Sequence, residues 1–421
     1  MSDLEELDKR VSWHPFTQMH QWQPLVIARG DGNYLVDEIG RRYFDGVSSL
    51  WCNVHGHRHP RLDRALAAQV ERLAHSTYLG LTHEPGIRLA AALIDVAPEG
   101  LTRVFYSDSG STAVEIALKQ SFQYWQVTGH PSKTKFVRLG DAYHGDTLGA
   151  VGVGGIELFH RMFGPLLVDS IAIPSPAIDA IASRDQLERI VLSRHDEIAA
   201  LVIEPLVQGA AGILVHPRGY LKYASDLCRA MNVHLIVDEV ATGFGRTGTL
   251  FACEQEAVSP DFLCLGKGIS GGYLPLAATL ATETIYQVFL GEKHELKQFF
   301  HGHTYTANPL ACAVGLESLQ LLQDQTLHNG QVMIEPLTRA LNRVGALNRV
   351  DSIRQCGLMA GIVLKPGAEP VGARVCEHVR TNGVILRPLG DVVVWMPPLS
   401  VEPDDVTLLE QATMLAIQAL R

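Results

Sequence analysis

The chain has 421 residues, of which 47% are hydrophobic and 19% charged, and its formal net charge is −10. These values are typical of a globular enzyme and exclude an intrinsically disordered chain. The charge is spread along the sequence without a basic run, which argues against nucleic acid as a partner. The seven cysteines are scattered, the N-terminus is unlike a signal peptide, and no apolar run reaches the ~20 residues of a membrane span. We therefore expect a cytoplasmic enzyme without membrane contact.

Short extended segments come first in the chain, and Gly and Asp separate them at turn positions. They read PLVIARGDG, NYLVDEIG and RRYFDGV and predict a small meander. Beyond it, helical patterns such as RLDRALAAQVERLAH and STAVEIALKQSFQYWQ alternate with the apolar strands RVFYS, KFVRL, AALVI, HLIVD and FLCLG. This alternation predicts an α/β domain with a mostly parallel sheet covered by helices on both faces. The last part of the chain, with IRQCGLMAGIVL, GVILRPLG, DVVVWMPP and a terminal helix, predicts a separate α+β unit.

Charged and polar residues follow several of these predicted strands directly. Glu204 follows AALVI, Asp238 follows HLIV, Lys267 follows FLCLG, and Gly110 and Ser111 follow RVFYSDS. In such a sheet, ligands bind beyond the carboxyl ends of the strands. Because parallel strands point the same way, we expect these residues to converge on one edge of the sheet.

Gly110 and Ser111 open a predicted helix after a strand and a tight turn. Free amides at a helix start, together with hydroxyl groups, suit a phosphate. The alternative is that Ser111 only caps the helix. The sequence has no GxxxxGK[ST] motif, and the glycines of residues 149–155 lack GxGxxG spacing, so neither a nucleoside triphosphate nor a dinucleotide is indicated.

Asp238 and Lys267 are the two charges that need a partner. A carboxylate at the end of an apolar strand is costly to bury unless it meets a cation or a donor, and the pyridinium nitrogen of pyridoxal phosphate is one such group. A helix cap or an ion pair with Arg246 are the alternatives. Lys267 lies between an apolar strand and glycines, where burial lowers the pKa of an amine nucleophile; a solvated loop lysine is the alternative.

Aromatic and histidine residues complete the set of candidates. Tyr143, in YHGDT, follows the strand KFVRL and can lay its ring on a planar cofactor, or it can lie in a turn without a function. His55, His57 and His59 alternate as metal ligands can, but no cysteine or carboxylate completes the set, so we expect loop or packing roles and no metal. His303, taken on its own, is interpreted in the same way.

Motifs along nearly the whole chain resemble, in order and spacing, the class III aminotransferases, which are fold type I enzymes that use pyridoxal phosphate. They read DSGSTAVEIALK, YHGDT, IEPLVQGAAG, DEVATGFGRTG, CLGKGISGG and HGHTYTANPLAC. Within the class, WHPFTQM, SSLWCNVHGHRHP, FQYWQ and ILRPLGDVVVWMPP resemble the 8-amino-7-oxononanoate aminotransferases of biotin biosynthesis. The resemblance implies a large cofactor-binding domain, residues 56–325, with a mostly parallel seven-stranded sheet sandwiched by helices. It also implies a smaller α+β domain formed by residues 1–55 and 326–421.

The resemblance also assigns cofactor-binding roles. Lys267 binds the cofactor and then carries the proton between substrate and cofactor. Asp238 holds the pyridine nitrogen and Tyr143 stacks on the ring. Gly110 and Ser111 hold the phosphate.

Further residues carry roles only through this resemblance. Glu204 and His303 join the cofactor site, and Thr304 reaches the phosphate of the partner subunit, so a homodimer shares its active sites. The substrate residues are Phe16, Leu50, Trp51, Tyr143, Gly302 and Arg387. Arg387 pairs with the substrate carboxylate, as suits the guanidinium fork.

The implied reaction converts 8-amino-7-oxononanoate to 7,8-diaminononanoate in two half-reactions, with S-adenosylmethionine or lysine as amino donor. Members that use S-adenosylmethionine commonly have WHPYTxM and SSWW, whereas this chain has Phe16 and Leu50 at the corresponding places. An ω-amino acid or diamine aminotransferase is the first alternative. A non-catalytic binding protein on the same scaffold is the second.

Overall fold

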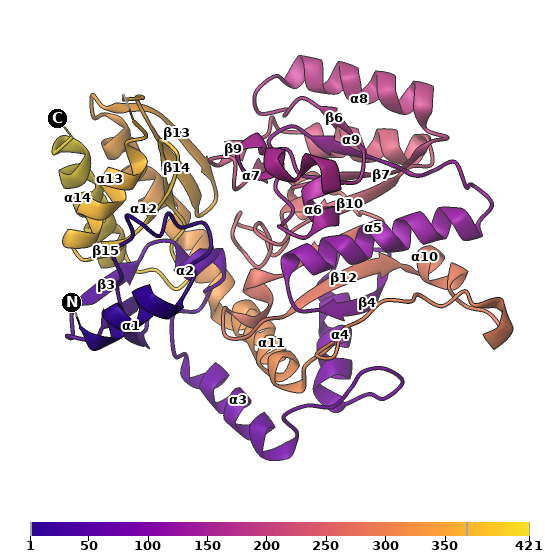
Figure 1. The fold of residues 1–421 in the computed structure, drawn as a ribbon, viewed down its shortest axis with the longest axis horizontal. Coiled ribbons are helices and arrows are strands. Elements are labelled where there is room, and N and C mark those ends of the chain that lie inside the picture. The colour runs from indigo at the N-terminus through magenta and orange to yellow at the C-terminus, as the bar shows by residue number, and fades with distance from the viewer. Residues whose placement is uncertain (1, 368, 421) are drawn as a thin grey trace.

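The computed structural model describes residues 2–367 and 369–420, and its largest element is a seven-stranded sheet (Figure 1). In spatial order the strands are β4 (Leu101–Ser107), β12 (Ala277–Thr282), β11 (Phe262–Leu265), β10 (His234–Asp238), β7 (Ile198–Ile203), β5 (Lys135–Leu139) and β6 (Ser170–Ile173). β12 is antiparallel to both neighbours, and the pairs from β11 to β6 are all parallel. The predicted fold class, a mostly parallel seven-stranded sheet, is therefore confirmed.

Helices cover both faces of this sheet, and alternation along β7 shows why. Ala200 and Val202 pack with α5 (Gly110–Val127) in one apolar cluster, whereas Leu201 and Ile203 join the other cluster. Successive side chains of a strand point to opposite faces, so a strand buried on both faces needs apolar residues throughout. The helices of the second face include α4 (Glu84–Val96), α8 (Ala180–Arg194) and α9 (Tyr220–Ala230).

A smaller unit combines the two ends of the chain. β1 (Ile27–Asp31), β2 (Tyr34–Asp37) and β3 (Arg42–Asp45) form the predicted meander, and β15 (Val384–Ile385) pairs in parallel with β3. A second sheet contains β13 (Val350–Cys356), β14 (Met359–Leu364), β17 (Val392–Trp395) and β16 (Arg387–Leu389). The division at residues 55 and 325 stays a prediction, which this pairing of β3 with β15 supports.

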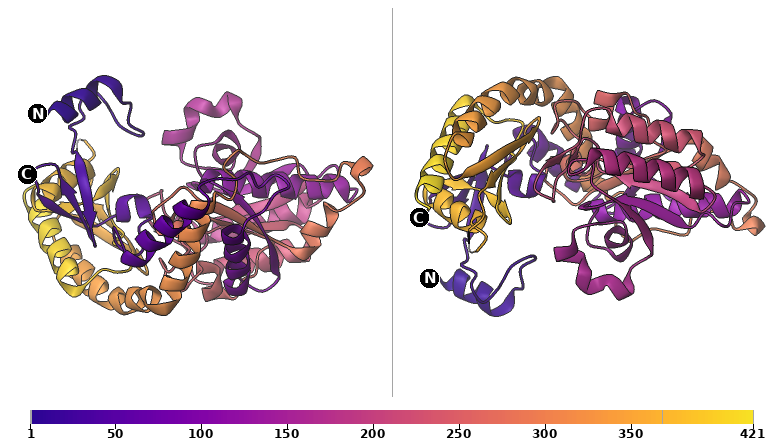
Figure 2. Two further views of the ribbon diagram at one scale, coloured as in Figure 1. Left: turned by 90° about the horizontal axis from the view of Figure 1, so that it is seen from below. Right: turned by 90° about the horizontal axis from the view of Figure 1, so that it is seen from above.

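The C-terminal helices pack around the outside of the smaller unit, and α1 stands apart at the N-terminus (Figure 2). These helices are α12 (Leu327–Gly345), α13 (Gly372–Thr381) and α14 (Pro403–Gln418). The remaining elements are α1 (Asp3–Val11), α2 (Ser48–Trp51), α3 (Pro60–Arg72), α6 (Leu148–Gly152), α7 (Glu157–His160), α10 (Glu283–Val288), α11 (Pro309–Leu321), β8 (Val207–Gln208) and β9 (Leu214–Val215). Within residues 2–367 and 369–420, we find no helix that combines the length and apolarity of a membrane span.

Candidate active site

A pocket lies where the strands of the large sheet end, and residues from distant parts of the chain line it. The predicted residues among them are Trp51, Gly110, Ser111, Tyr143, Glu204, Asp238 and Lys267. His144, Gly145, Ala210, Val240 and Ala241 also line it. The convergence expected from the strand ends is therefore present, and we call this set of residues the inner wall.

Lys267 comes after β11 and begins a single 3₁₀ turn, Lys267–Ser270. The φ angle of Lys267 is 44°. Its Nζ atom lies 4.8 Å from the centroid of the Trp51 ring. Burial lowers the pKa of the Lys267 amine, and the charges of Asp238 and Glu204 oppose this shift. A lysine with a lowered pKa is more often unprotonated and can act as a nucleophile or take up a proton.

Asp238 is the last residue of β10, and its carboxylate has two partners. Nδ1 of His144 donates to Oδ2 over 2.7 Å, and the amide of Val240 donates to Oδ1 over 3.0 Å. Both Asp238 and His144 are buried. Arg246 instead donates to the backbone oxygens of Pro397 and Asn53, so it is not the ion-pair partner of Asp238. The Asp238 carboxylate therefore lines the pocket and is held there by its hydrogen bond to His144.

The start of α5 fits a phosphate group. Ser109 is the N-cap residue and accepts a hydrogen bond from the amide of Thr112, so Ser111 is not the cap. Gly110 and Ser111 are thus the first helical residues, whose amides have no intrahelical acceptor. A Cβ atom at Gly145 would overlap Oγ of Ser111, so only glycine leaves this space open. Free amides, a hydroxyl group and an obligatory glycine fit an anion, as the resemblance requires.

Glu204 fixes the backbone of Tyr143 by a hydrogen bond. Its Oε1 accepts from the amide of Tyr143 over 3.1 Å, and its Oε2 accepts from the amide of Gly209 over 2.9 Å. Burial raises the pKa of Glu204 to about 7. The Tyr143 hydroxyl donates to Oδ2 of Asp146 over 2.8 Å, and burial raises the pKa of Tyr143. These contacts place the Tyr143 ring at the pocket.

The remaining predicted residues, Phe16, Leu50, Gly302, His303, Thr304 and Arg387, do not line this pocket, and we call them the rim. Phe16 and Leu50 are 59% and 48% exposed. The Phe16 ring meets Phe159 edge-on at 5.4 Å between centroids, and Phe159 lies 6.3 Å from Tyr143. The N-terminal segment therefore approaches Tyr143 through one intervening aromatic ring.

The other rim residues come from two separate parts of the fold. Arg387 begins β16, and its charge lowers the pKa of Tyr143 against the larger effect of burial. The Nε2 atom of His303 lies 3.9 Å from Oδ1 of Asp108, whereas Gly302 and Thr304 are exposed. Residues 302–304 therefore do not reach the pocket of their own chain.

The sequence analysis did not assign His144 or Val240 to the site. His144 is adjacent to Tyr143 in the motif YHGDT, but its bond to Asp238 spans 94 positions. A Cβ atom at Gly110 would overlap the Val240 side chain, so Val240 packs directly under the start of α5. The adjacency of His144 to Tyr143 was the one sequence feature that could have indicated His144, because a polar residue next to a predicted ligand lies in the same surroundings.

The three alternating histidines have separate contacts. His55 bonds to Thr326 at 3.0 Å and to Ser318 at 2.9 Å, and His59 accepts from the amide of Arg61 at the start of α3. His57 donates to Asp45. In the described part of the chain, no group of three His, Cys, Asp or Glu side chains is arranged to hold a metal ion.

Relatives and solved structures agree on the family. The family model described as aminotransferase class III matches residues 16–417. An adenosylmethionine-8-amino-7-oxononanoate aminotransferase of Geobacter sulfurreducens is 48% identical, over 96% of this chain and 95% of the relative. An enzyme of the same name from Aquifex aeolicus is also 48% identical, over 99% and 97%.

The solved structures show the same architecture. The crystal structure of the adenosylmethionine-8-amino-7-oxononanoate aminotransferase of Methanocaldococcus jannaschii has a TM-score of 0.96 and 41% identity, over 99% of this chain and 98% of that one. An amine transaminase from an uncultivated Pseudomonas species, solved with pyridoxal phosphate bound, has a TM-score of 0.91 and 35% identity, over 97% and 98%. The chain belongs to the class III aminotransferases and is an aminotransferase that depends on pyridoxal phosphate.

Proposed function

We propose that this enzyme transfers an amino group to 8-amino-7-oxononanoate and forms 7,8-diaminononanoate, a step of biotin biosynthesis, with S-adenosylmethionine as donor. The carrying observation is that Lys267 and the Asp238–His144 pair stand in one pocket with the start of α5. The names of relatives at 40–50% identity, matched over 82–98% of their own length, support the substrates. A cytoplasmic location remains part of the proposal.

Pyridoxal phosphate, when bound, supplies an electron-accepting ring that stabilises negative charge on the substrate carbon. In this proposal Asp238 keeps the pyridine nitrogen protonated, and His144 fixes the carboxylate by its bond to Oδ2. The amides of Gly110 and Ser111 would bind the phosphate, and Tyr143 would stack on the ring. Glu204 supports Tyr143 through its backbone amide.

Lys267 is the residue that moves protons. The lowered pKa of Lys267 leaves more of the amine unprotonated, so Nζ would hold the cofactor between turnovers and would be able to take a proton from the substrate carbon. The Trp51 ring, 4.8 Å from Nζ, shields this atom from water on one side. The same position above an aromatic face also favours the protonated amine that forms during the transfer.

We place the substrate carboxylate at Arg387. The guanidinium binds a planar carboxylate through two parallel hydrogen bonds, which fixes one end of a long oxo acid. The effect of the Arg387 charge on the pKa of Tyr143 supports this assignment, because a charge shifts a titrating group only when the two lie near one another. Phe16 and Leu50 then lie at the entrance, next to the donor.

We further propose a homodimer in which residues 302–304 complete the partner's site, with Thr304 at the partner's phosphate. The exposure of Gly302 and Thr304, and their absence from the pocket of their own chain, support a role between subunits. Sedimentation equilibrium of the wild-type protein is expected to give twice the mass of the chain. A monomer with full activity would contradict this assignment.

The experiment that tests the reaction separates its two halves. The enzyme loaded with pyridoxal phosphate is mixed with one amine at a time, and loss of its visible absorbance reports amino transfer to the cofactor. We expect S-adenosylmethionine to act fastest, and 8-amino-7-oxononanoate to restore the absorbance afterwards. If lysine were the only active amine, the donor would be lysine. Lysine is the alternative donor because Phe16 and Leu50 depart from the motifs of enzymes that use S-adenosylmethionine.

The same assay discriminates the alternative function. An ω-amino acid or diamine aminotransferase would be reduced by its own amines, and 8-amino-7-oxononanoate would not restore the absorbance. The solved ω-transaminases share the fold at 29–30% identity, lower than the 48% of the relatives above. This difference in identity is the reason that we place the oxononanoate reaction first.

A further inference from the structure

The turn that carries Trp51 has a strained backbone. Ser48, Ser49 and Trp51 have φ values of 50°, 61° and 66°. Residues with a Cβ atom rarely adopt this left-handed region, because the Cβ atom meets the backbone. Three such residues among four positions persist only where the surroundings hold them. Contacts from outside the turn therefore hold it in this conformation.

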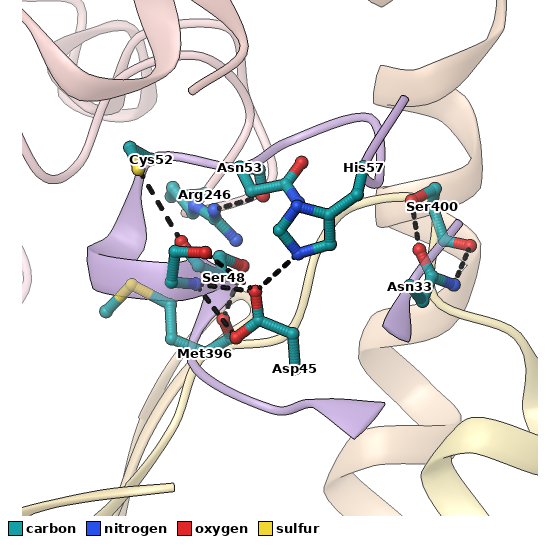
Figure 3. Close-up of polar contacts among 10 residues, drawn as sticks. Asn33, Asp45, Ser48, Cys52, Asn53, His57, Arg246, Met396 and Ser400 are labelled. Atoms are coloured by element: carbon teal, nitrogen blue, oxygen red, sulfur yellow. Dashed lines mark hydrogen bonds and ion pairs between the residues drawn. The ribbon is translucent and has the colours of Figure 1, made fainter. Parts of the chain in front are cut away.

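A buried carboxylate makes most of these contacts (Figure 3). Asp45, at the end of β3, is fully buried and accepts from the amide of Ser49 at 2.8 and 2.7 Å and from its hydroxyl at 3.0 Å. His57 donates from Nε2 to Oδ2 of Asp45 over 2.9 Å. The Ser48 hydroxyl adds a bond to the backbone oxygen of Met396 at 2.7 Å.

The turn and the reacting amine are joined through the Trp51 ring. Trp51 is 6% exposed and packs with Met359, Met396 and their neighbours on one side. Lys267 Nζ lies on the ring. A Cβ atom at Gly209 would come within 3.1 Å of the ring, so the space for the indole is closely bounded. A change in the backbone of the turn therefore moves the ring against Lys267.

We propose that Asp45, oriented by His57, is a positioning residue that fixes the Trp51 ring against Lys267 and thereby sets the activity of the site. The proposal rests on the assignment of the Lys267 pocket as the active site. Asp45 touches neither the pocket nor the expected cofactor position. It acts only through the four-residue turn, which its carboxylate closes.

Asp37 provides a matched control, because it is a buried carboxylate in the same sheet that closes a different turn. It is 3% exposed and accepts from the amides of Ile39 and Arg41 and from the Tyr43 hydroxyl. Its contacts do not include the turn of Trp51. Asp37→Asn therefore reproduces the loss of a buried charge in this sheet without the link to Lys267.

The first measurement observes the ring in the cofactor-free protein. Labelling with 5-fluorotryptophan gives one fluorine resonance for each of the five tryptophans, and the Trp51→Phe variant identifies the one from Trp51. We expect Asp45→Asn and His57→Gln to shift or broaden the Trp51 resonance, whereas Asp37→Asn leaves it unchanged. An unchanged Trp51 resonance in folded Asp45→Asn protein would overturn the proposal.

The second measurement is a double-mutant cycle on kcat/KM. Asp45→Asn is expected to lower kcat/KM about tenfold when Trp51 is present and less than about twofold in a Trp51→Ala background, since contacting residues couple. Equal losses in both backgrounds would show that Asp45 acts independently of Trp51. Wild-type protein without aminotransferase activity would contradict the proposed function, whereas the fluorine spectra test the positioning role independently.

Discussion

The inner wall and the rim of the site differ in how the fold holds them. Asp238 ends β10, Lys267 closely follows β11, and the buried His144 bonds to Asp238 within the same chain. Phe16 and Thr304 lie on exposed segments away from the pocket. The large sheet therefore positions the groups that we assign to proton transfer, whereas several residues that we assign to the substrate lie on loops and on the N-terminal segment.

The largest expected effect concerns Asp238 in the inner wall. Asp238→Asn keeps the shape but removes the negative charge, so the pyridine nitrogen loses its counter-ion and kcat/KM is expected to fall roughly 10²–10³-fold. Steady-state kinetics at saturating cofactor measure this loss.

Asp261 is the matched control for Asp238. It lies before β11, at the opposite end of the sheet, and accepts from the amide of Leu235 over 2.8 Å. Asp261→Asn is expected to lower the melting temperature and leave kcat/KM nearly unchanged. Equal kinetic losses in the two variants would remove the distinction between the carboxyl edge and the rest of the sheet.

The second effect is a dependence of stability on pH that belongs to Glu204. Burial raises its pKa from 4.5 in the unfolded chain to about 7 in the fold. The folded state therefore binds this proton more tightly, so the contribution is complete below pH 4.5 and is lost as the pH rises through 7. Its size is on the order of 3 kcal/mol.

Glu204→Gln removes this titration. In the cofactor-free protein, the variant is expected to gain stability relative to wild type between pH 5 and pH 8, as measured by thermal melting. Glu188→Gln, on exposed surface, is the control and should show a constant difference from wild type. A constant difference for Glu204→Gln as well would mean that the buried carboxyl titrates at its ordinary pKa.

The smallest expected effect is that of a rim substitution, and it concerns only the oxo-acid substrate. Arg387→Ala is expected to raise KM for the oxo acid about tenfold, because one charge-assisted contact is lost. The rate with the amino donor should change little, because Arg387 is assigned to the carboxylate of the oxo acid. Arg374→Ala, exposed on α13, should leave both half-reactions unchanged. A fall in kcat for both halves would move Arg387 from the rim to the inner wall.

Asp238 and Lys267 of the inner wall could be predicted from the sequence because a local pattern marks their positions. A charged residue directly after an apolar strand lies at the sheet edge, which places Asp238 and Lys267 without knowledge of the packing. His144 could not be assigned in this way, because its bond to Asp238 depends on how β5 and β10 align. The link from Asp45 to Trp51 was hidden for the same reason, since hydrogen bonds and left-handed backbone are properties of the folded turn.

The rim is difficult to predict because its residues lie on segments that no strand or helix pattern locates. The motif HGHTYTANP identifies Thr304 by resemblance, but the residue is exposed in the described chain and its proposed partner belongs to a second copy. Phe16 approaches Tyr143 through Phe159, which no local pattern marks. Such positions depend on loop conformation and, for Thr304, on the proposed dimer, and neither follows from strand or helix periodicity.

The central claim is that Lys267 holds the cofactor in this pocket, and chemical trapping tests it most directly. The protein loaded with pyridoxal phosphate is reduced with borohydride, digested and analysed by mass spectrometry. We predict that the pyridoxyl group is found on Lys267, and that Lys267→Ala protein carries none at this site. A pyridoxyl group on another lysine of active wild-type enzyme, with Lys267 unmodified, would contradict the account.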